Sequence, residues 1–96
     1  MLASARSESP VLLDVREDWE FAICQIAGSR LVPMSQVPDT LASLNPVKTT
    51  VVICHSGIRS EQVAGYLERN GFQDVINLEG GIDAWAREID QSMATY

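Results

Sequence analysis

The segment 50–60 constrains the fold more than any other part of this sequence. It opens with the run TVVI at 50–53, in which every residue is β-branched, and such residues strongly favour a strand. Mostly small or polar residues follow at 54–60, and apolar residues then recur at helical spacing, at Val63, Tyr66 and Leu67. The segment therefore predicts a strand, a short loop and a helix in direct succession.

The same alternation of short apolar runs and helical patterns continues along the rest of the chain. Further strands are predicted at 11–13, 31–32 and 75–78, and helices over about 18–24, 38–44 and 82–89. Strands that alternate with helices form a parallel sheet with helices on its faces, so we predict an α/β fold. In such sheets ligands bind beyond the carboxyl ends of the strands, and Cys54 lies at one such end.

The length of the chain limits the number of domains, and its charge limits the kinds of partner it can bind. With 96 residues, we expect one domain at 10–90, a disordered or linker segment at 1–9 and a tail at 91–96. The net charge of −6 argues against nonspecific nucleic-acid binding, because a negative surface repels phosphates. No apolar run approaches the roughly 20 residues of a membrane-spanning helix, and no secretory signal is visible.

The two cysteines, Cys24 and Cys54, are too few for a disulfide framework or a four-ligand zinc site. His, Cys and carboxylate residues do not gather at metal-ligand spacing, so we predict no metal. A nucleotide-binding fingerprint is also missing, so we predict no cofactor. Without an export signal we expect reduced thiols and a cytoplasmic location.

The surroundings of Cys54 suggest anion chemistry. Gly57 lets the loop curl so that successive N–H groups face inward, and the start of the next helix adds about half a positive charge. Arg59 contributes a permanent positive charge. A thiol in such a cradle ionises more readily than a free one. These features alone leave two interpretations open, a reactive thiol or a buried packing cysteine.

Three stretches of the sequence resemble one family. The loop CHSGIRS at 54–60 resembles the active-site loop of rhodanese-like sulfurtransferases, which have the pattern C-x-x-G-x-R-S. The run LLDVRE at 12–17 is similar to their L-D-V-R-E motif, and 71–85 is similar to their closing G-F…V…L-x-G-G…W motif. The likeness covers about 11–85 and implies a three-layer rhodanese-like fold with a mostly parallel sheet.

The resemblance also implies an activity. Cys54 would be the nucleophile that accepts a sulfane sulfur and becomes a persulfide, as in two-step covalent transfer. The loop that binds the outer sulfur would comprise His55, Ser56, Gly57, Ile58, Arg59 and Ser60. The donor would be thiosulfate or a persulfide, and the acceptor cyanide, a thiol or a protein cysteine. We expect no nucleic-acid or membrane partner.

Two other functions stay open at this point. The domain could relay sulfur or dock within a larger protein. It could also be a phosphatase or arsenate reductase on the same fold, although only four residues separate Cys54 from Arg59. Phosphatases of the C-x5-R kind have a longer loop that admits a tetrahedral phosphate, so the spacing favours sulfur.

The remaining candidates have structural interpretations. Asp14 and Arg16 follow a strand, and we expect a structural ion pair or caps near the loop. Cys24 is expected to be a packed free cysteine, with a resolving thiol as the alternative. Trp19 and Trp85, at helical positions, are expected in the core.

Overall fold

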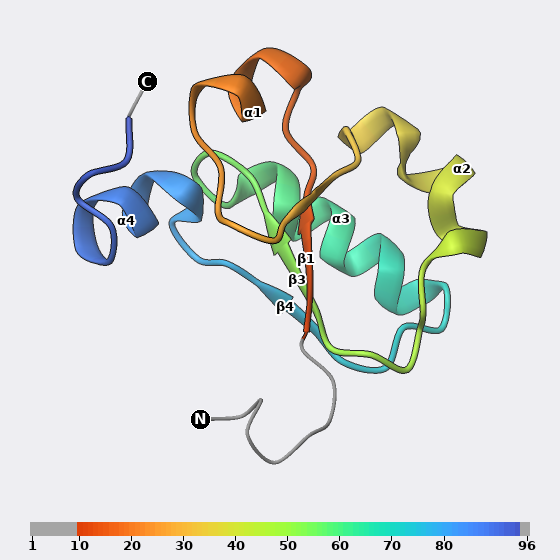
Figure 1. Cartoon of the computed structure of the whole chain (residues 1–96). Helices are drawn as coiled ribbons and strands as arrows, with labels where there is room; N and C mark the ends of the chain where they lie inside the picture. Colours follow the sequence, from red (N-terminus) through yellow and green to blue (C-terminus); the bar gives the residue numbers. More distant parts are fainter. Residues whose placement is uncertain (1–9, 95–96) are drawn as a thin grey trace.

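The computed structural model describes residues 10–94 (Figure 1). The linker expected at 1–9 and the last two residues of the expected tail lie outside this range. The strands are β1 (Val11–Asp14), β2 (Arg30–Leu31), β3 (Thr50–Ile53) and β4 (Val75–Asn77). The helices are α1 (Asp18–Ile23), α2 (Val37–Thr40), α3 (Ile58–Arg69) and α4 (Gly81–Glu88), and short 3-10 turns, η2 (Met34–Gln36) and η3 (Leu41–Ser43), flank α2.

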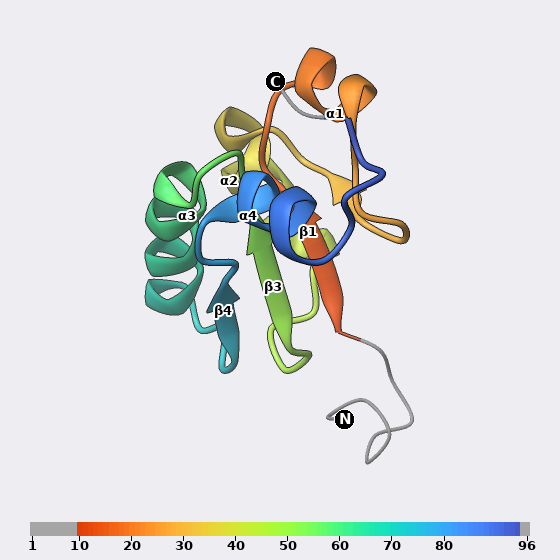
Figure 2. The same cartoon turned by 90° about the vertical axis from the view of Figure 1, so that its left-hand side faces the viewer.

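The four strands form one parallel sheet in the order β2-β1-β3-β4, which confirms the predicted α/β fold. β3 is an inner strand, because it pairs with β1 from Val11↔Thr50 to Asp14↔Ile53 and with β4 on its other side. Figure 2 shows the strand arrows pointing toward the side of the molecule that carries α1. The end of β3, and with it Cys54, therefore lies in the middle of the carboxyl edge of the sheet.

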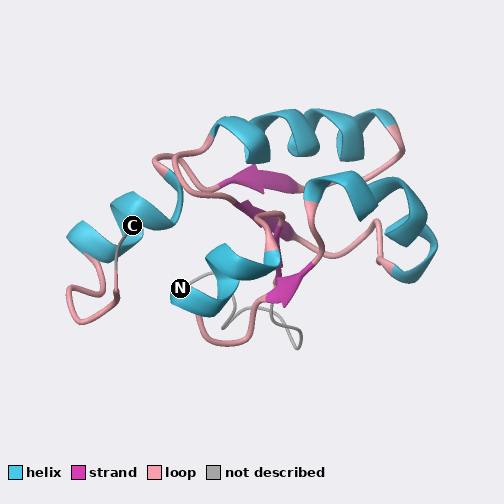
Figure 3. Cartoon of the chain, turned by 90° about the horizontal axis from the view of Figure 1, so that it is seen from above, coloured by secondary structure: helices cyan, strands magenta, loops and turns pink. Residues whose placement is uncertain are grey.

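Helices cover both faces of the sheet. Successive side chains of a strand point to opposite faces, so these apolar strands present apolar side chains on both faces, and both must be covered. Figure 3 shows α3 and α1 on opposite sides of the strands. Leu13 and Val52 pack with Val63 and Leu67 of α3 in one core cluster. The second cluster, on the other face, joins Ile53 to Ile82 of α4 and to Cys24, the residue after α1. These two clusters fix the positions of the helices around the carboxyl edge.

Two details differ from the sequence-based prediction. Trp19, expected in the core, is 61% exposed, because the short helix α1 buries Glu20 instead. The helix predicted over 38–44 is divided into α2 and η3, and the 3-10 turn η2 precedes it. Each 3-10 turn closes with a hydrogen bond to the residue three positions earlier in the chain. The amide of Gln36 donates to Pro33 O, and the amide of Leu44 donates to Leu41 O. Trp85 is half-buried.

No helix within 10–94 is long and apolar enough to cross a membrane. In the same residues, no group of three or more His, Cys, Asp or Glu side chains is arranged to hold a metal ion.

Candidate active site

Cys54 follows β3 directly, and its sulfur is surrounded by donors from the next loop. The amide of Gly57 donates to Cys54 Sγ over 3.0 Å, and Ser60 Oγ lies 3.3 Å from the same sulfur. Cys54 itself is only 1% exposed, whereas Ser56 and Ile58 of the loop lie at the surface. The thiol is therefore buried beneath an exposed rim, and its surroundings are hydrogen-bond donors as well as apolar side chains.

Gly57 gives the loop its curl. Its φ of +102° is in the left-handed region, and it is the N-cap of α3. A Cβ at this position would lie 3.3 Å from the amide nitrogen of Gly80. The turn at Gly57 brings the first residues of α3 back toward the sulfur, which is how Ser60, in the first turn of the helix, reaches Cys54.

The start of α4 fixes the opposite side of the loop. The amide of Ile82 donates to Cys54 O over 2.8 Å, and that of Asp83 donates to His55 O over 3.0 Å. In a trans peptide the C=O and N–H groups point in opposite directions, so the amide of Ser56 faces away from α4. Gly81 makes this approach possible, because a Cβ there would overlap the carbonyl oxygens of Cys54 and His55.

These contacts decide the acidity of the thiol. Burial raises the pKa of Cys54, because it disfavours the charged form. The hydroxyl of Ser60 and the backbone amides of Ser60, Gly57 and Ser56 lower the pKa by hydrogen bonding to the sulfur, and the net result is a pKa below that of an ordinary thiol. The site therefore stabilises a thiolate.

Asn77, which the sequence analysis missed, supports two parts of this loop. Ser60 Oγ donates to Asn77 Oδ1, and Asn77 Nδ2 donates to Gly57 O over 3.3 Å. Asn77 is the last residue of β4, the strand beside β3. Its place at the same carboxyl edge as Cys54 was the available signal.

Glu20 is the second residue that the sequence analysis missed. Its two carboxylate oxygens accept hydrogen bonds from the two terminal nitrogens of Arg59, each over 2.8 Å. Glu20 is 5% exposed and Arg59 34% exposed, so the pair is partly buried. Glu20 also accepts a hydrogen bond from the amide of Glu17 over 2.9 Å, as in a capping box, and this spacing was the only signal in the sequence. The pair joins α1 to the Cys54 loop and compensates the charge of Arg59.

Asp14 and Arg16 form a buried ion pair beside the site. Arg16 Nη2 lies 2.7 Å from Asp14 Oδ2, and both side chains are fully buried. Arg16 also donates to Glu20 O and Cys24 O, over 3.2 Å and 2.7 Å. Arg16 therefore holds the C-terminal half of α1 and its C-cap beside β1. Cys24 is a buried free cysteine whose sulfur lies 3.8 Å from Arg16 Nη1.

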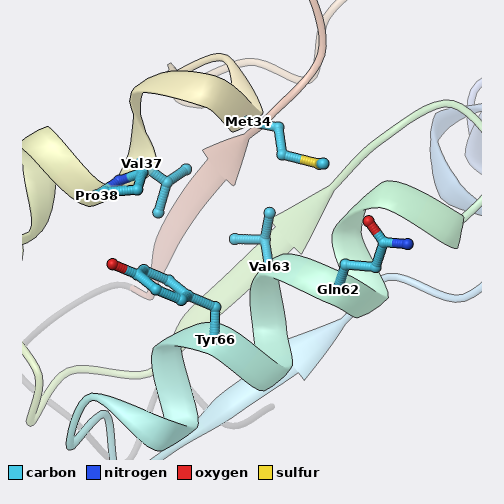
Figure 4. A pocket seen from close by; sticks show the side chains of 6 residues that line it. All are labelled: Met34, Val37, Pro38, Gln62, Val63 and Tyr66. Carbon is cyan, nitrogen blue, oxygen red and sulfur yellow. The ribbon is translucent and has the colours of Figure 1, made fainter.

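An apolar pocket of about 180 Å³ lies between α2 and α3, on the face of the sheet that α3 covers. In Figure 4, Val37 and Val63 face each other across the pocket, with Met34 toward one end and Tyr66 toward the other. Its lining residues are Met34, Val37, Pro38, Gln62, Val63 and Tyr66. None of them belongs to the segment 54–60, so this pocket is separate from the thiol site.

The chain is similar to known proteins in sequence and in fold. The sequence model of the family described as "Rhodanese-like domain" matches residues 2–88. The crystal structure of a rhodanese-like domain protein from Staphylococcus aureus matches with a TM-score of 0.80 and 36% identity, over 99% of this chain and 89% of that one.

Two relatives differ in how much of their length this chain covers. The chain is 42% identical to the putative sulfurtransferase YtwF of Bacillus subtilis, over 84% of this chain and 78% of the relative. It is 43% identical to the chloroplastic Rhodanese-like/PpiC domain-containing protein 12 of Arabidopsis thaliana, over 88% of this chain. That match spans only 30% of the Arabidopsis protein.

Proposed function

Because the chain belongs to the rhodanese-like domain family, we propose that it is a sulfurtransferase that works through a persulfide on Cys54. The observation that carries the proposal is the cradle around the sulfur, formed by the Gly57 amide and the Ser60 hydroxyl. The lowered pKa of Cys54 supports it, because a thiolate is the nucleophilic form of cysteine. Relatives such as YtwF that are named sulfurtransferases support it as well.

In the first half-reaction, the Cys54 thiolate attacks the outer sulfur of the donor. A new S–S bond forms as the donor's bond to that sulfur breaks, and the electron pair leaves with the donor remnant, which is sulfite if the donor is thiosulfate. In the second half-reaction, cyanide or a thiolate attacks the outer sulfur of the persulfide, and the Cys54 thiolate leaves. The predicted kinetics are ping-pong.

The loop contributes charge stabilisation in both steps. The amides of Ser56, Gly57 and Ser60 stabilise the negative charge on Cys54 Sγ before the attack and when the thiolate is regenerated. The outer sulfur of the persulfide would lie on the same side of the loop as these amides. His55 and Arg59 hold the loop in place, His55 through its carbonyl bond to Asp83 and Arg59 through Glu20.

Intact-mass measurement after incubation with a sulfur donor tests the proposal without assuming an acceptor. We expect the protein to gain the mass of one sulfur atom, the gain to be reversed by cyanide, and Cys54→Ser to show no gain. A stable protein that never gains sulfur from thiosulfate or from a persulfide would refute the proposal.

A sulfur-relay module of a longer protein is the second candidate, because the chain spans only 30% of the Arabidopsis relative. It predicts that Cys54 gains sulfur but turns over slowly with small acceptors. We do not propose a phosphatase or arsenate reductase, because only four residues separate Cys54 from Arg59 and the two terminal nitrogens of Arg59 already bind Glu20.

A further inference from the structure

We propose that one face of α4 is a docking site for a basic segment of another protein. An apolar side chain of that segment enters a groove beside α4, and its arginine or lysine side chains contact two carboxylates at the groove. The surface includes no residue of the segment 54–60, so the inference is independent of the sulfurtransferase proposal.

The helix α4 buries one face against the sheet and leaves another face open. Ile82 and Ala86 are buried, and Ile82 belongs to the core cluster on that side of the sheet. Ala84 and Trp85 lie four and three residues before Glu88, so these three share a different face of the helix. That face borders a groove of about 220 Å³. In Figure 1, α4 stands at the side of the molecule, and α1 and α3 both lie to its right.

The groove is lined mainly by apolar side chains. Besides Ala84 and Trp85, these include Leu78, which precedes the helix, and Ile89, which follows it. Trp85 is half-buried, whereas Ile89 is 65% exposed. The volume is below the roughly 300–1,000 Å³ of sites for drug-sized ligands. The groove therefore suits one or two side chains of a protein better than a cofactor.

Two carboxylates border the same groove. Glu79 and Glu88 are both exposed, and within 10–94 neither side chain takes part in an ion pair or a hydrogen bond. The basic residue of α4, Arg87, pairs with Asp83 over 3.4 Å and does not line the groove. The groove therefore combines apolar side chains with two negative charges that no described cation compensates.

Charge selects the occupant of this groove. A second copy of the chain has a net charge of −6, so its approach to two further carboxylates is unfavourable. A basic segment is attracted instead, and a guanidinium also packs well on an aromatic ring such as that of Trp85. The methylene stems of lysine and arginine cover apolar surface while their charged ends stay at the carboxylates.

The position of α4 gives this surface a place in the molecule. The first residues of the helix support the Cys54 loop, through the amides of Ile82 and Asp83. A partner bound along α4 is therefore held beside the carboxyl edge of the sheet without occupying the loop that surrounds the thiol.

Proton–nitrogen NMR of the full chain tests the inference, because Trp19 and Trp85 are the only two residues with an indole N–H. The probe is a short peptide of alternating arginine and leucine, and Trp19→Phe assigns the two signals. We expect the Trp85 signal to move with peptide concentration while the Trp19 signal stays in place. A peptide with glutamine in place of arginine should cause no movement. One with glycine in place of leucine should bind at least about threefold more weakly, because it buries less apolar surface.

Variants of the groove separate its two contributions. Glu79→Gln combined with Glu88→Gln should weaken peptide binding about fivefold, and added salt should reduce this difference. Asp39→Asn combined with Glu68→Gln is the matched control, because it removes two exposed carboxylates from α2 and α3. It should change the affinity by less than about twofold. Ile89→Ser, which removes an exposed apolar side chain, should weaken binding about threefold.

Several results would overturn the inference. A Trp85 signal that never moves shows that the peptide does not bind, and equal movement of both indole signals or equal weakening in the two double variants shows unspecific attraction to an acidic protein. An equal response to spermidine assigns the groove to small polycations. A Trp85 signal that moves with protein concentration alone assigns it to a second copy of the chain.

Discussion

Ser60 Oγ lies 3.3 Å from Cys54 Sγ and at the same time hydrogen-bonds Asn77. A hydroxyl has a single proton. When that proton points to Asn77 Oδ1, Ser60 can only accept a hydrogen bond from the thiol. When it points to the sulfur, it stabilises the thiolate. The direction of one O–H bond therefore contributes to the acidity of Cys54.

The first prediction concerns Ser60→Ala. The substitution removes a hydrogen bond that lowers the pKa of Cys54, so that pKa must rise. Since the thiolate is the reactive form, wild-type alkylation by iodoacetamide slows as the pH falls through the lowered pKa, and in the variant this transition moves to higher pH. Hydrogen bonds to charged groups contribute about 1.5–3 kcal/mol, so sulfur loading at neutral pH should fall about tenfold or more. An alkylation profile identical to that of the wild type would contradict the assignment.

The second prediction concerns Asn77→Asp. A carboxylate at this position holds the Ser60 proton away from the sulfur and adds a negative charge at the carboxyl edge. Both effects disfavour the thiolate, so the alkylation profile should again move to higher pH. In the double variant with Ser60→Ala, the shift due to Asn77→Asp should be smaller, since the shared hydroxyl is gone. Fully additive shifts would show that Asn77 does not act through Ser60.

The third prediction concerns Gly81→Ala. Its Cβ would overlap Cys54 O and His55 O, so the start of α4 must withdraw and the loop loses its support. Overpacking of this kind costs about 1–3 kcal/mol of unfolding free energy, and sulfur loading should fall with it. Gly28→Ala is the control, because Gly28 has a comparable φ of +84° but no neighbour within 4 Å of the added Cβ. Comparable losses of sulfur loading in the two variants would rule out the clash as the cause.

The fourth prediction concerns the buried ion pair. Asp14→Ala leaves the Arg16 guanidinium buried without its carboxylate, and breaking a buried pair in this way costs about 3–5 kcal/mol. Arg87→Ala breaks an exposed pair, with a distance of 3.4 Å to Asp83, and should cost less than about 1 kcal/mol. Urea unfolding of both variants measures the difference, and losses of similar size would argue against a structural role for Asp14.

The sequence predicted the parts of this molecule that depend on neighbouring residues. β3, the Cys54 loop and α3 follow one another directly, so composition and spacing locate them and place Cys54 at the carboxyl edge. Glu20 and Asn77 are different, because their partners Arg59 and Ser60 are 39 and 17 positions away. No periodic pattern reports such contacts. The exposure of Trp19 was missed for a related reason. The short helix α1 turns Glu20 inward to pair with the distant Arg59, and this leaves Trp19 on the outer side of the helix.

The contact between α4 and the carbonyls of Cys54 and His55 has a consequence for how the protein is made on the ribosome. Synthesis proceeds from the N-terminus, so the thiol emerges well before Ile82 and Asp83. Until α4 has left the exit tunnel, the carbonyls of Cys54 and His55 lack the amides of Ile82 and Asp83 that orient them. A nascent chain halted before that point would present Cys54 in a loop that lacks one of its supports, and the cradle around the thiol would be complete only after α4 has been synthesised.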